Sequence, residues 1–345
     1  MAEQVDQADQ ADQVNQDDQA ENETTPSPDK VVVIENLTKK FGEFTAVDNL
    51  SMTVERGRIL GFIGPNGAGK TTTIKILVGL AKPTEGRAII AGVDCLAEAH
   101  RIKKLVGYMP DRFGGYSNMR VREYLDFFGA AFKIPRKERR ARIQEVLEIT
   151  RAVYMQDRYV EALSHGMQQR VGIARTLLHD PEVLIFDEPA NGLDPEARIE
   201  MRDLLLRLAD LGKTLIVTSH ILPELARICD QIGIISAGKL RAFGTMKEIN
   251  EQLGQMRMVE IQLNGDTDLD RAQEIVKREL TLAEIAGSRT EQLIRFRANV
   301  TEDSMQALLT TLITEKIAIS QFREVQTDLE DAFLTVTKED RAKMV

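Results

Sequence analysis

One glycine-rich segment, residues 64–71, constrains the fold of this chain more than any other part of the sequence. It reads GPNGAGKT and fits the pattern G-x-x-x-x-G-K-[ST] between an apolar run at 59–63 and a helical pattern at 70–80. Glycines let the backbone pass close to phosphate oxygens, so that N–H groups and a helix N-terminus face the anion. We therefore predict a nucleoside triphosphate site, with the Lys70 charge on the outer phosphates and the Thr71 hydroxyl on Mg²⁺. The residues expected to bind the nucleotide here are Gly64, Pro65, Asn66, Gly67, Ala68, Gly69, Lys70, Thr71 and Thr72.

Polar side chains follow two apolar runs further along the chain. Asp187 and Glu188 close the run at 183–186, and His220 follows the run at 215–218. A buried carboxylate needs a partner, and Mg²⁺ beside the phosphates is the natural one for Asp187. Glu188 is then placed to polarise a water for attack on the γ-phosphate, and His220 to contact that phosphate at the carboxyl edge of the sheet. Taken alone, the acidic pair also fits an ordinary polar strand end and the histidine a structural role, so this interpretation depends on the glycine-rich segment.

Strand-like and helical patterns alternate along most of the chain. The alternation predicts an α/β fold, a parallel sheet with helices on both faces, and the mostly helical stretch at about 112–165 reads as an insertion beside it. The expected strands lie at 31–34, 50–54, 59–63, 88–90, 106–109, 183–186, 215–218, 232–235, 258–263, 293–297 and 317–325. The expected helices lie at 70–80, 121–132, 136–150, 269–280, 305–314 and 329–337, and another carries Met201, Leu204, Leu205, Leu208 and Leu211.

These patterns divide the chain into three parts. Residues 1–29 read as a disordered acidic tail, 30–250 as a nucleotide-binding domain, and 255–345 as a small α+β domain. The pattern of the third part is that of a split βαβ arrangement. It carries no glycine-rich loop and no Cys/His cluster, so the sequence gives it no chemistry of its own.

The charge of the chain is concentrated in its tail. The formal net charge is −9, yet residues 1–29 hold nine acidic residues and no Lys or Arg. The rest of the chain therefore contains equal numbers of acidic and basic residues. A balanced surface argues against nucleic-acid binding by bulk charge. No apolar run approaches 18 residues, and we see no secretory signal. Cys95 and Cys229 form no disulfide framework or metal spacing, so we expect a cytoplasmic protein.

Several ordered motifs make residues 31–248 resemble the nucleotide-binding subunit of an ABC (ATP-binding cassette) transporter. Residues 163–170, LSHGMQQR, resemble the signature motif of that family, 191–194 match its D-loop, and 219–220 match its H-loop. Phe41 lies where the family places an aromatic residue on the adenine, with Phe44 as its competitor.

The resemblance implies a P-loop ATPase with a parallel-sheet core, an antiparallel β part and a helical insertion. It implies that the protein binds ATP and Mg²⁺, and that Thr71, Asp187 and Asp111 bind the metal. It also implies a head-to-tail dimer, in which the signature segment of one subunit completes the ATP site of the other. The residues to which these roles fall are Lys70, Glu188 and His220 for catalysis, Ser164, His165, Gly166 and Met167 for the site in trans, and Asp194 for the D-loop.

Two departures from the family pattern stand out. His165 and Met167 replace the commonest Gly and Gln of the signature, and Asp111 replaces the usual Mg²⁺-contacting Gln. A carboxylate is a better ligand for a hard cation than an amide, so one expectation is that Mg²⁺ binding survives or tightens. The alternative is that the change perturbs the coupling of this loop to a membrane partner. Gly-Met signature variants and the segment LEDAF at 329–333 resemble the branch that drives export through ABC-2-type permeases.

We therefore expect an ATPase subunit that pairs with a second copy and drives a separate membrane permease, held at the inner face of the membrane. Part of the aromatic cluster at 124–132 is a candidate to receive that permease, although most of it reads as core. The alternative is a soluble ABC-type ATPase acting on a non-membrane complex, and a third hypothesis makes the C-terminal domain a ligand sensor. The basic run at 136–142 lacks interleaved aromatic residues and reads as a solvated helix face, so no nucleic-acid partner is expected.

Overall fold

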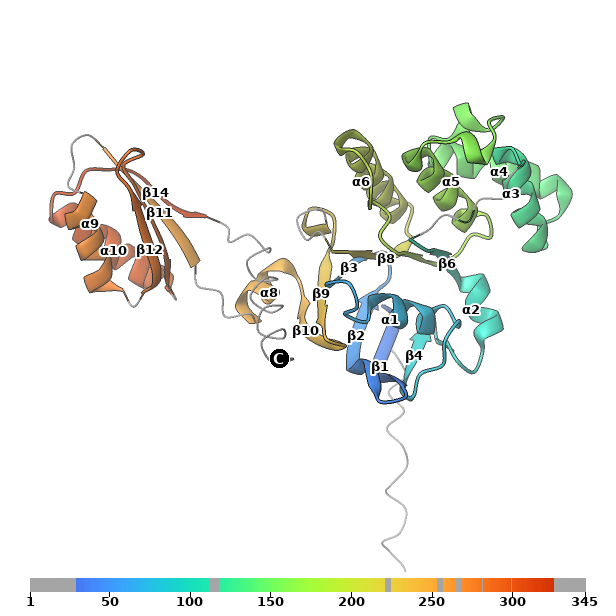
Figure 1. Ribbon diagram of the computed structural model, residues 1–345, viewed down its shortest axis with the longest axis horizontal. Helices are drawn as coiled ribbons and strands as arrows, with labels where there is room; N and C mark the ends of the chain where they lie inside the picture. Colours follow the sequence, from blue (N-terminus) through green and yellow to red (C-terminus); the bar gives the residue numbers. More distant parts are fainter. Residues whose placement is uncertain are drawn as a thin grey trace, which may run out of the picture.

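The computed structural model describes residues 29–111, 114, 118–220, 225–252, 257–264, 269–280, 282–298 and 300–325. The tail up to residue 28, the expected helix at 329–337 and the LEDAF segment lie outside these residues. The described strands form three sheets, two in the N-terminal part of the chain and one in the C-terminal part (Figure 1).

The first sheet is antiparallel, with strand order β2-β1-β4-β5. Its strands are β1 (Lys30–Phe41), β2 (Phe44–Glu55), β4 (Glu85–Ile90) and β5 (Val93–Asp94). Buried Val, Ile and Leu side chains of β1 and β2 share one core cluster with helix α1 (Lys70–Leu77). The cluster also includes Leu60 and Phe62 of the second sheet, so α1 begins in a core that both sheets build.

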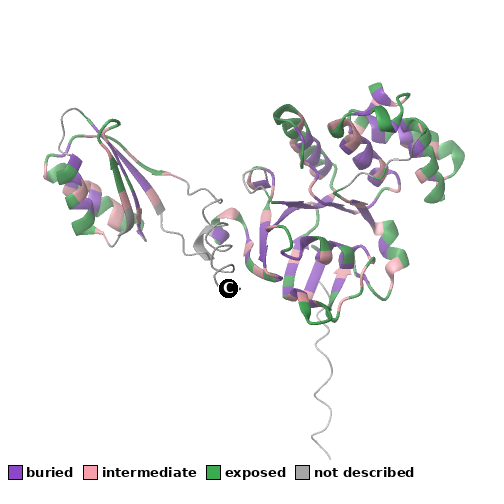
Figure 2. Cartoon of the chain, viewed as in Figure 1, coloured by how far each residue is buried: buried purple, intermediate pink, exposed green. Residues whose placement is uncertain are grey.

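The second sheet has six strands in the order β10-β9-β3-β8-β7-β6. These are β3 (Ile59–Ile63), β6 (Val106–Met109), β7 (Val183–Phe186), β8 (Thr214–Ser219), β9 (Gln231–Ser236) and β10 (Lys239–Gly244). All neighbours pair in parallel except β10, which runs antiparallel to β9 at one edge. The strands β3, β7 and β8 are buried along their whole length, as expected for a parallel sheet covered on both faces (Figure 2). The sequence prediction of an α/β fold with a parallel core is confirmed.

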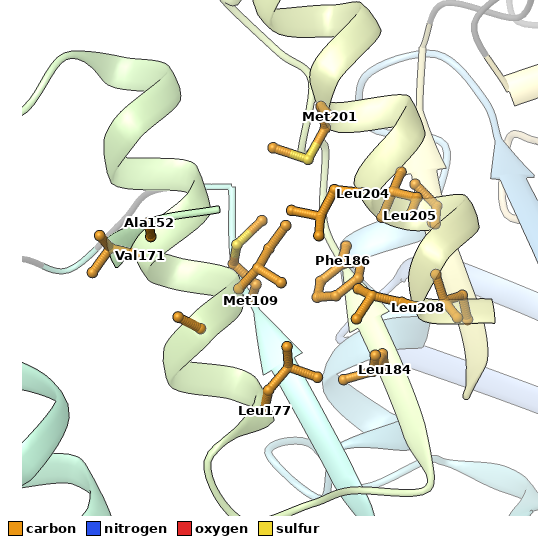
Figure 3. Packing of buried hydrophobic residues seen from close by; sticks show 14 of the residues in the cluster. Met109, Ala152, Val171, Leu177, Leu184, Phe186, Met201, Leu204, Leu205 and Leu208 are labelled. Carbon is orange, nitrogen blue, oxygen red and sulfur yellow. The ribbon is translucent and has the colours of Figure 1, made fainter. Parts of the chain in front are cut away.

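Helices cover the face of this sheet opposite α1. They are α3 (Val121–Ala131), α4 (Arg136–Ile149), α5 (His165–Leu177) and α6 (Pro195–Asp210), with α2 (Ala99–Leu105) and α8 (Met246–Gln252) elsewhere in this part of the chain. Figure 3 shows Leu177 of α5 and Leu204 of α6 packed around Phe186 and Leu184 of β7. Helices α3 and α4 share this cluster, which anchors the helical insertion to the sheet.

Most expected elements are confirmed, and three strands match residue for residue, at 59–63, 106–109 and 183–186. Elements β5, α2, α5, β10, α8 and β12 are not among the ranges predicted above. Strand β10 carries Lys239 and Arg241 at the sheet edge, so no continuous apolar run reveals it. Helix α2 buries only Ile102, which leaves no amphipathic stripe to recognise.

The C-terminal sheet is fully antiparallel, with strand order β12-β13-β11-β14. Its elements are β11 (Arg257–Leu263), α9 (Leu269–Glu279), β12 (Leu282–Ser288), β13 (Leu293–Ala298), α10 (Glu302–Thr314) and β14 (Ile319–Val325). Both helices pack into a core cluster that contains only residues of this part of the chain (Figure 1). The succession βαββαβ is the split βαβ arrangement expected from the sequence, with β12 as the strand that the sequence did not reveal.

The two arginines that flank Glu260 tie three strands of the C-terminal sheet together. Arg295 Nε donates to Glu260 Oε1 at 2.6 Å, and Arg323 Nε donates to Glu260 Oε2 at 2.9 Å. The hydrogen bonds from Arg323 and Arg295 hold the pKa of the Glu260 carboxyl below its usual value. The network therefore connects β11 to both of its neighbours, β13 and β14.

Candidate functional site

The glycine-rich segment packs so closely on two neighbouring strands that side chains are excluded at its ends. A Cβ on Gly64 would lie 2.3 Å from the carbonyl oxygen of Ile235 in β9. A Cβ on Gly69 would lie 2.5 Å from the carbonyl oxygen of Ala46 in β2, and Gly69 has φ +111°. Within the same glycine-rich segment, the carbonyl oxygen of Ala68 accepts a hydrogen bond from Gly238 N–H at 3.0 Å. Such a close-packed turn before a helix N-terminus fits a phosphate group.

Lys70 is the first residue of α1 and is almost fully buried. Its Nζ donates to the Gly64 carbonyl oxygen at 2.5 Å and lies 3.4 Å from Glu188 Oε1. A buried ammonium group needs anionic or carbonyl partners, and here the loop and the end of β7 supply them. The lysine and the acidic pair predicted from the sequence therefore belong to one site.

Asp187 lies between two hydroxyl groups from different elements. Thr71 Oγ1 donates to Asp187 Oδ2 at 3.2 Å, and Thr218 Oγ1 donates to Asp187 Oδ1 at 2.7 Å. Burial raises the pKa of the Asp187 carboxyl, and the charges of Glu188 and Asp111 raise it further against the effect of the two hydroxyls. This carboxylate is therefore destabilised in its charged form, which a divalent cation would relieve.

Glu188 adopts a left-handed backbone conformation, with φ +55°. Its N–H donates to Thr218 Oγ1 at 2.9 Å, and its Oε2 lies 2.7 Å from His220 Nδ1. Because its other carboxylate oxygen faces Lys70, the side chain is held between the loop and the end of β8. Thr218 was not selected from the sequence. The feature that could have revealed Thr218 is the parallel pairing of β7 with β8. Phe186 pairs with Val217, so Thr218 lies beside Asp187.

Lys70, Asp187, Glu188 and His220 line a cleft of about 390 Å³ at the carboxyl edge of the second sheet. The lining residues are Phe44, Ala46, Pro65, Asn66, Gly67, Ala68, Gly69, Lys70, Thr71, Thr72, Asp111, Asp187, Glu188, Asn191 and His220. Phe41, the aromatic residue chosen from the sequence, is not among them, whereas its competitor Phe44 is. The two residues are register partners across the β1–β2 turn, but Phe44 lies on the same strand as Ala46, which also lines the cleft.

The metal-side residues offer only oxygen ligands. Thr71 and Asp187 are hydrogen-bonded to each other, and Asp111 lines the same cleft. The described part of the chain holds no group of three or more His, Cys, Asp or Glu residues that could enclose a metal. A hydroxyl and one or two carboxylates suit Mg²⁺, which keeps several waters and takes other oxygens from substrate phosphates.

The signature residues lie in a second cavity of about 400 Å³, which shares no lining residue with the cleft. Ser164 is the N-cap of α5, and its hydroxyl accepts a hydrogen bond from Met167 N–H at 3.4 Å. Asp194 caps α6, accepting from Ala197 N–H at 2.8 Å. The described structure thus brings Lys70 together with the acidic pair, and leaves Ser164, His165, Gly166, Met167 and Asp194 at a separate surface.

Comparison with known proteins is consistent with this geometry. Residues 47–191 match the family model described as ABC transporter. The Nod factor export ATP-binding protein I of Ralstonia nicotianae (strain ATCC BAA-1114 / GMI1000) is 40% identical over 219 residues, which cover 64% of this chain and 68% of that protein. The chain belongs to the family of ABC transporter ATP-binding proteins. This ABC transporter subunit is also 31% identical over 304 residues to the linearmycin resistance ATP-binding protein LnrL of Bacillus subtilis (strain 168), covering 88% of this chain and 97% of LnrL.

A solved structure extends the comparison to the fold of the cassette. The dimeric structure of MJ0796, a bacterial ABC transporter cassette, is 27% identical with a TM-score of 0.56, covering 62% of this chain and 98% of that one. The chain is thus the ATP-binding subunit of an ABC transporter, and its cassette hydrolyses ATP in transport. Within the residues that the structure describes, no helix combines the length and the apolar character needed to cross a bilayer.

Proposed function

We propose that this ABC transporter subunit hydrolyses Mg²⁺-ATP between two copies of itself and drives export through a separate membrane permease. The observation that carries the proposal is the separation of the two cavities within one chain. The cleft holds the residues for phosphate and metal, whereas the cavity at Ser164 and Gly166 has no phosphate loop of its own. A head-to-tail pair of chains sets each cavity against the cleft of the other, and MJ0796 is a dimeric cassette.

The proposed roles follow from the contacts in the cleft. Lys70 and the loop amides hold the phosphates, because the loop carries a buried cation and a helix N-terminus. Glu188 accepts a proton from the attacking water, and His220 orients its carboxylate through the 2.7 Å contact while facing the γ-phosphate. Thr71, Asp187 and Asp111 hold Mg²⁺, which neutralises charge on the phosphate oxygens when bound.

Phe44 is the proposed aromatic partner of the adenine in place of Phe41. Its side chain is exposed beside the cleft, and Phe41 lies outside the lining and carries Lys39 Nζ 4.8 Å from its ring centre. A ring that already holds a cation over its face is less available for a base.

The helical insertion is the proposed contact for the permease. Tyr124 and Leu125 are buried in the core, whereas Phe127 and Phe132 of the same segment are 46% and 38% exposed. Exposed aromatic side chains are typical anchors of protein interfaces. Export is favoured because the relatives named above are a Nod factor export protein and a linearmycin resistance protein. The subunit would then reside at the inner face of the membrane through its permease.

We also propose that the chain is divided into the cassette at 30–250, with its helical insertion at about 112–165, and a C-terminal unit at 255–345. The separate core cluster of the C-terminal sheet supports this division. The match to LnrL covers 88% of the chain, so it extends beyond the cassette into this unit. Because this unit carries no glycine-rich loop in the sequence, we propose a regulatory rather than a catalytic role for it.

Complementation between two inactive variants tests the shared site. Lys70→Ala disables the cleft of its own chain, and Ser164→Arg disables the cavity that the chain offers to its partner. Each variant alone should release no phosphate, whereas a mixture should regain up to about a quarter of the native rate, because half of the dimers contain one intact site. A mixture as inactive as its components would contradict a site built from two copies.

Copurification tests the permease. The tagged chain is purified from membranes solubilised in mild detergent, and its partners are identified by mass spectrometry. A multi-spanning protein in stoichiometric amount supports the transporter function. Recovery of ribosomal proteins, or of no membrane protein, would contradict it.

A further inference from the structure

Three side chains link the signature segment of this chain to its own ATP cleft. His165 Nε2 lies 2.9 Å from the carbonyl oxygen of Asn191, so the imidazole donates this hydrogen bond. Asn191 Nδ2 in turn donates to Asp111 Oδ1 at 3.4 Å. Asn191 and Asp111 line the cleft, whereas His165 lines the second cavity. Two hydrogen bonds, one to the backbone and one from the side chain of Asn191, therefore connect His165 to Asp111.

The imidazole sits directly on the turn that follows Asn191. Gly192 has φ +71°, and a Cβ there would lie 3.5 Å from His165 Cδ2 and Nε2. With no side chain at 192, the ring lies over the turn and is hydrogen-bonded to it through the Asn191 carbonyl. A glycine at 165 would provide neither the hydrogen bond nor this contact, so the histidine fixes the position of the turn relative to α5.

The same turn is connected to the end of β7. Asn191 N–H donates to the carbonyl oxygen of Glu188 at 3.1 Å. A displacement of Asn191 therefore acts on two groups of the cleft, the backbone of Glu188 and the carboxylate of Asp111. Both lie within the proposed catalytic and metal-binding set.

We propose that His165 is a positioning residue that makes the two ATP sites of the dimer cooperative. The inference rests on the proposed function, because Ser164 and Gly166 must face the nucleotide of the partner subunit. When that nucleotide draws in the N-terminus of α5, His165 carries Asn191 with it and adjusts Glu188 and Asp111 in its own cleft. Occupancy of one site thereby changes the affinity of the other, which is a coupling free energy between sites.

The test compares the native chain with His165→Gly and Asn191→Ala. Asn191→Ala keeps the carbonyl that accepts from His165 and the N–H that donates to Glu188, and removes only the amide that reaches Asp111. His100→Gly is the matched control, since His100 and His165 are both exposed and both lie in the first turn of a helix. Phosphate release and binding of a fluorescent ATP analogue are measured against nucleotide concentration with Mg²⁺ present.

In the native chain the second ATP should bind about fivefold or more tightly than the first, which gives a Hill coefficient above one. His165→Gly and Asn191→Ala should lower the coefficient towards one, whereas His100→Gly should retain it. Thermal melts of all four proteins show whether a variant has lost its fold, and His165→Gln, which retains a donor, should restore part of the cooperativity.

The inference is overturned if the native chain shows hyperbolic dependence on ATP, or if His165→Gly remains as cooperative as the native chain. Unchanged cooperativity in Asn191→Ala would remove Asp111 from the link. These results differ from a failure of the proposed function, which would appear as absence of phosphate release from the native chain itself.

Discussion

The hydroxyl of Thr218 lies 2.7 Å from Oδ1 of Asp187. The same hydroxyl oxygen accepts a hydrogen bond from Glu188 N–H at 2.9 Å. One side chain of β8 therefore orients both acidic residues at the end of β7. The left-handed backbone of Glu188 is compatible with this arrangement because its N–H has a buried acceptor.

Glu188→Gln removes the proposed base and keeps the size of the side chain and one acceptor oxygen, while its second polar atom becomes a donor. We expect ATP binding to persist and turnover to fall by roughly two to four orders of magnitude. Phosphate release and binding of the fluorescent analogue measure the two effects. Glu145→Gln, on the exposed side of α4, is the control and should retain native turnover. Near-native hydrolysis by Glu188→Gln would exclude Glu188 as the base.

Phe44→Ala and Phe41→Ala form a matched pair across one turn. Both side chains are more than half exposed, at 62% and 55%, but only Phe44 lines the cleft. Loss of base stacking should weaken ATP binding by about tenfold in Phe44→Ala. Phe41→Ala should leave the dissociation constant unchanged, as measured by isothermal titration calorimetry. The reverse order would restore Phe41 as the adenine contact.

Asp187→Asn should stabilise the nucleotide-free protein while abolishing hydrolysis. Burial raises the pKa of Asp187 in the folded state above its usual 3.8, so the unfolded chain ionises first as the pH rises. The free energy of unfolding therefore falls as the pH rises from the unfolded-state pKa to the folded-state pKa of Asp187. Above both values the loss of stability is complete. Asparagine does not ionise, so Asp187→Asn avoids this loss. At pH 8 its melting temperature should exceed that of the native chain by about 2–4 °C, which corresponds to about 1 kcal/mol of unfolding free energy.

The gain in Asp187→Asn should shrink as the pH is lowered, because Asp187 of the native chain then becomes protonated in the fold. Differential scanning calorimetry in chelator at several pH values measures this trend. A variant that is less stable than the native chain at every pH would show that the carboxylate is not destabilised in the fold.

Gly69→Ala and Gly212→Ala separate backbone strain from steric collision. Both glycines have positive φ, but the space around Gly212 is open, whereas a Cβ on Gly69 meets the Ala46 carbonyl. Gly212→Ala should cost about 1 kcal/mol of unfolding free energy. Gly69→Ala should cost about 2 kcal/mol or more and abolish nucleotide binding. Urea unfolding and analogue binding measure both, and equal costs would contradict the close packing of the loop.

Asp111→Gln restores the residue that is commonest in the family at this position. Glutamine keeps an oxygen for Mg²⁺ and for the Asn191 amide, so ATPase activity should stay within about tenfold, or roughly 1.4 kcal/mol of barrier. Steady-state phosphate release at saturating Mg²⁺ measures it. Complete loss of turnover would show that the carboxylate is irreplaceable here.

The sequence predicted the parts of the site that depend on local order along the chain. The glycine-rich loop, Asp187 and Glu188 each follow a recognisable apolar run, and a strand end determines where they lie. Thr218 escaped prediction because its role arises from pairing between strands, and Asn191 was recognised only as part of the D-loop because its contacts arise from the packing of a turn against α5. Local order could not separate Phe41 from Phe44 either, since both flank the same turn and they differ only in that Phe44 lines the cleft.

The contacts of the glycine-rich loop with Ile235, Ala46 and Gly238 have a consequence for how ATP affinity is determined. The loop is shaped by backbone atoms of two sheets, so its amides are oriented before the nucleotide arrives and little ordering entropy is lost on binding. Affinity is thus a property of the strand framework as much as of the residues that touch phosphate. Substitutions in β9 or β2 that shift a carbonyl by a fraction of an ångström would retune the nucleotide concentration at which the transporter works, with every residue of the ATP cleft unchanged.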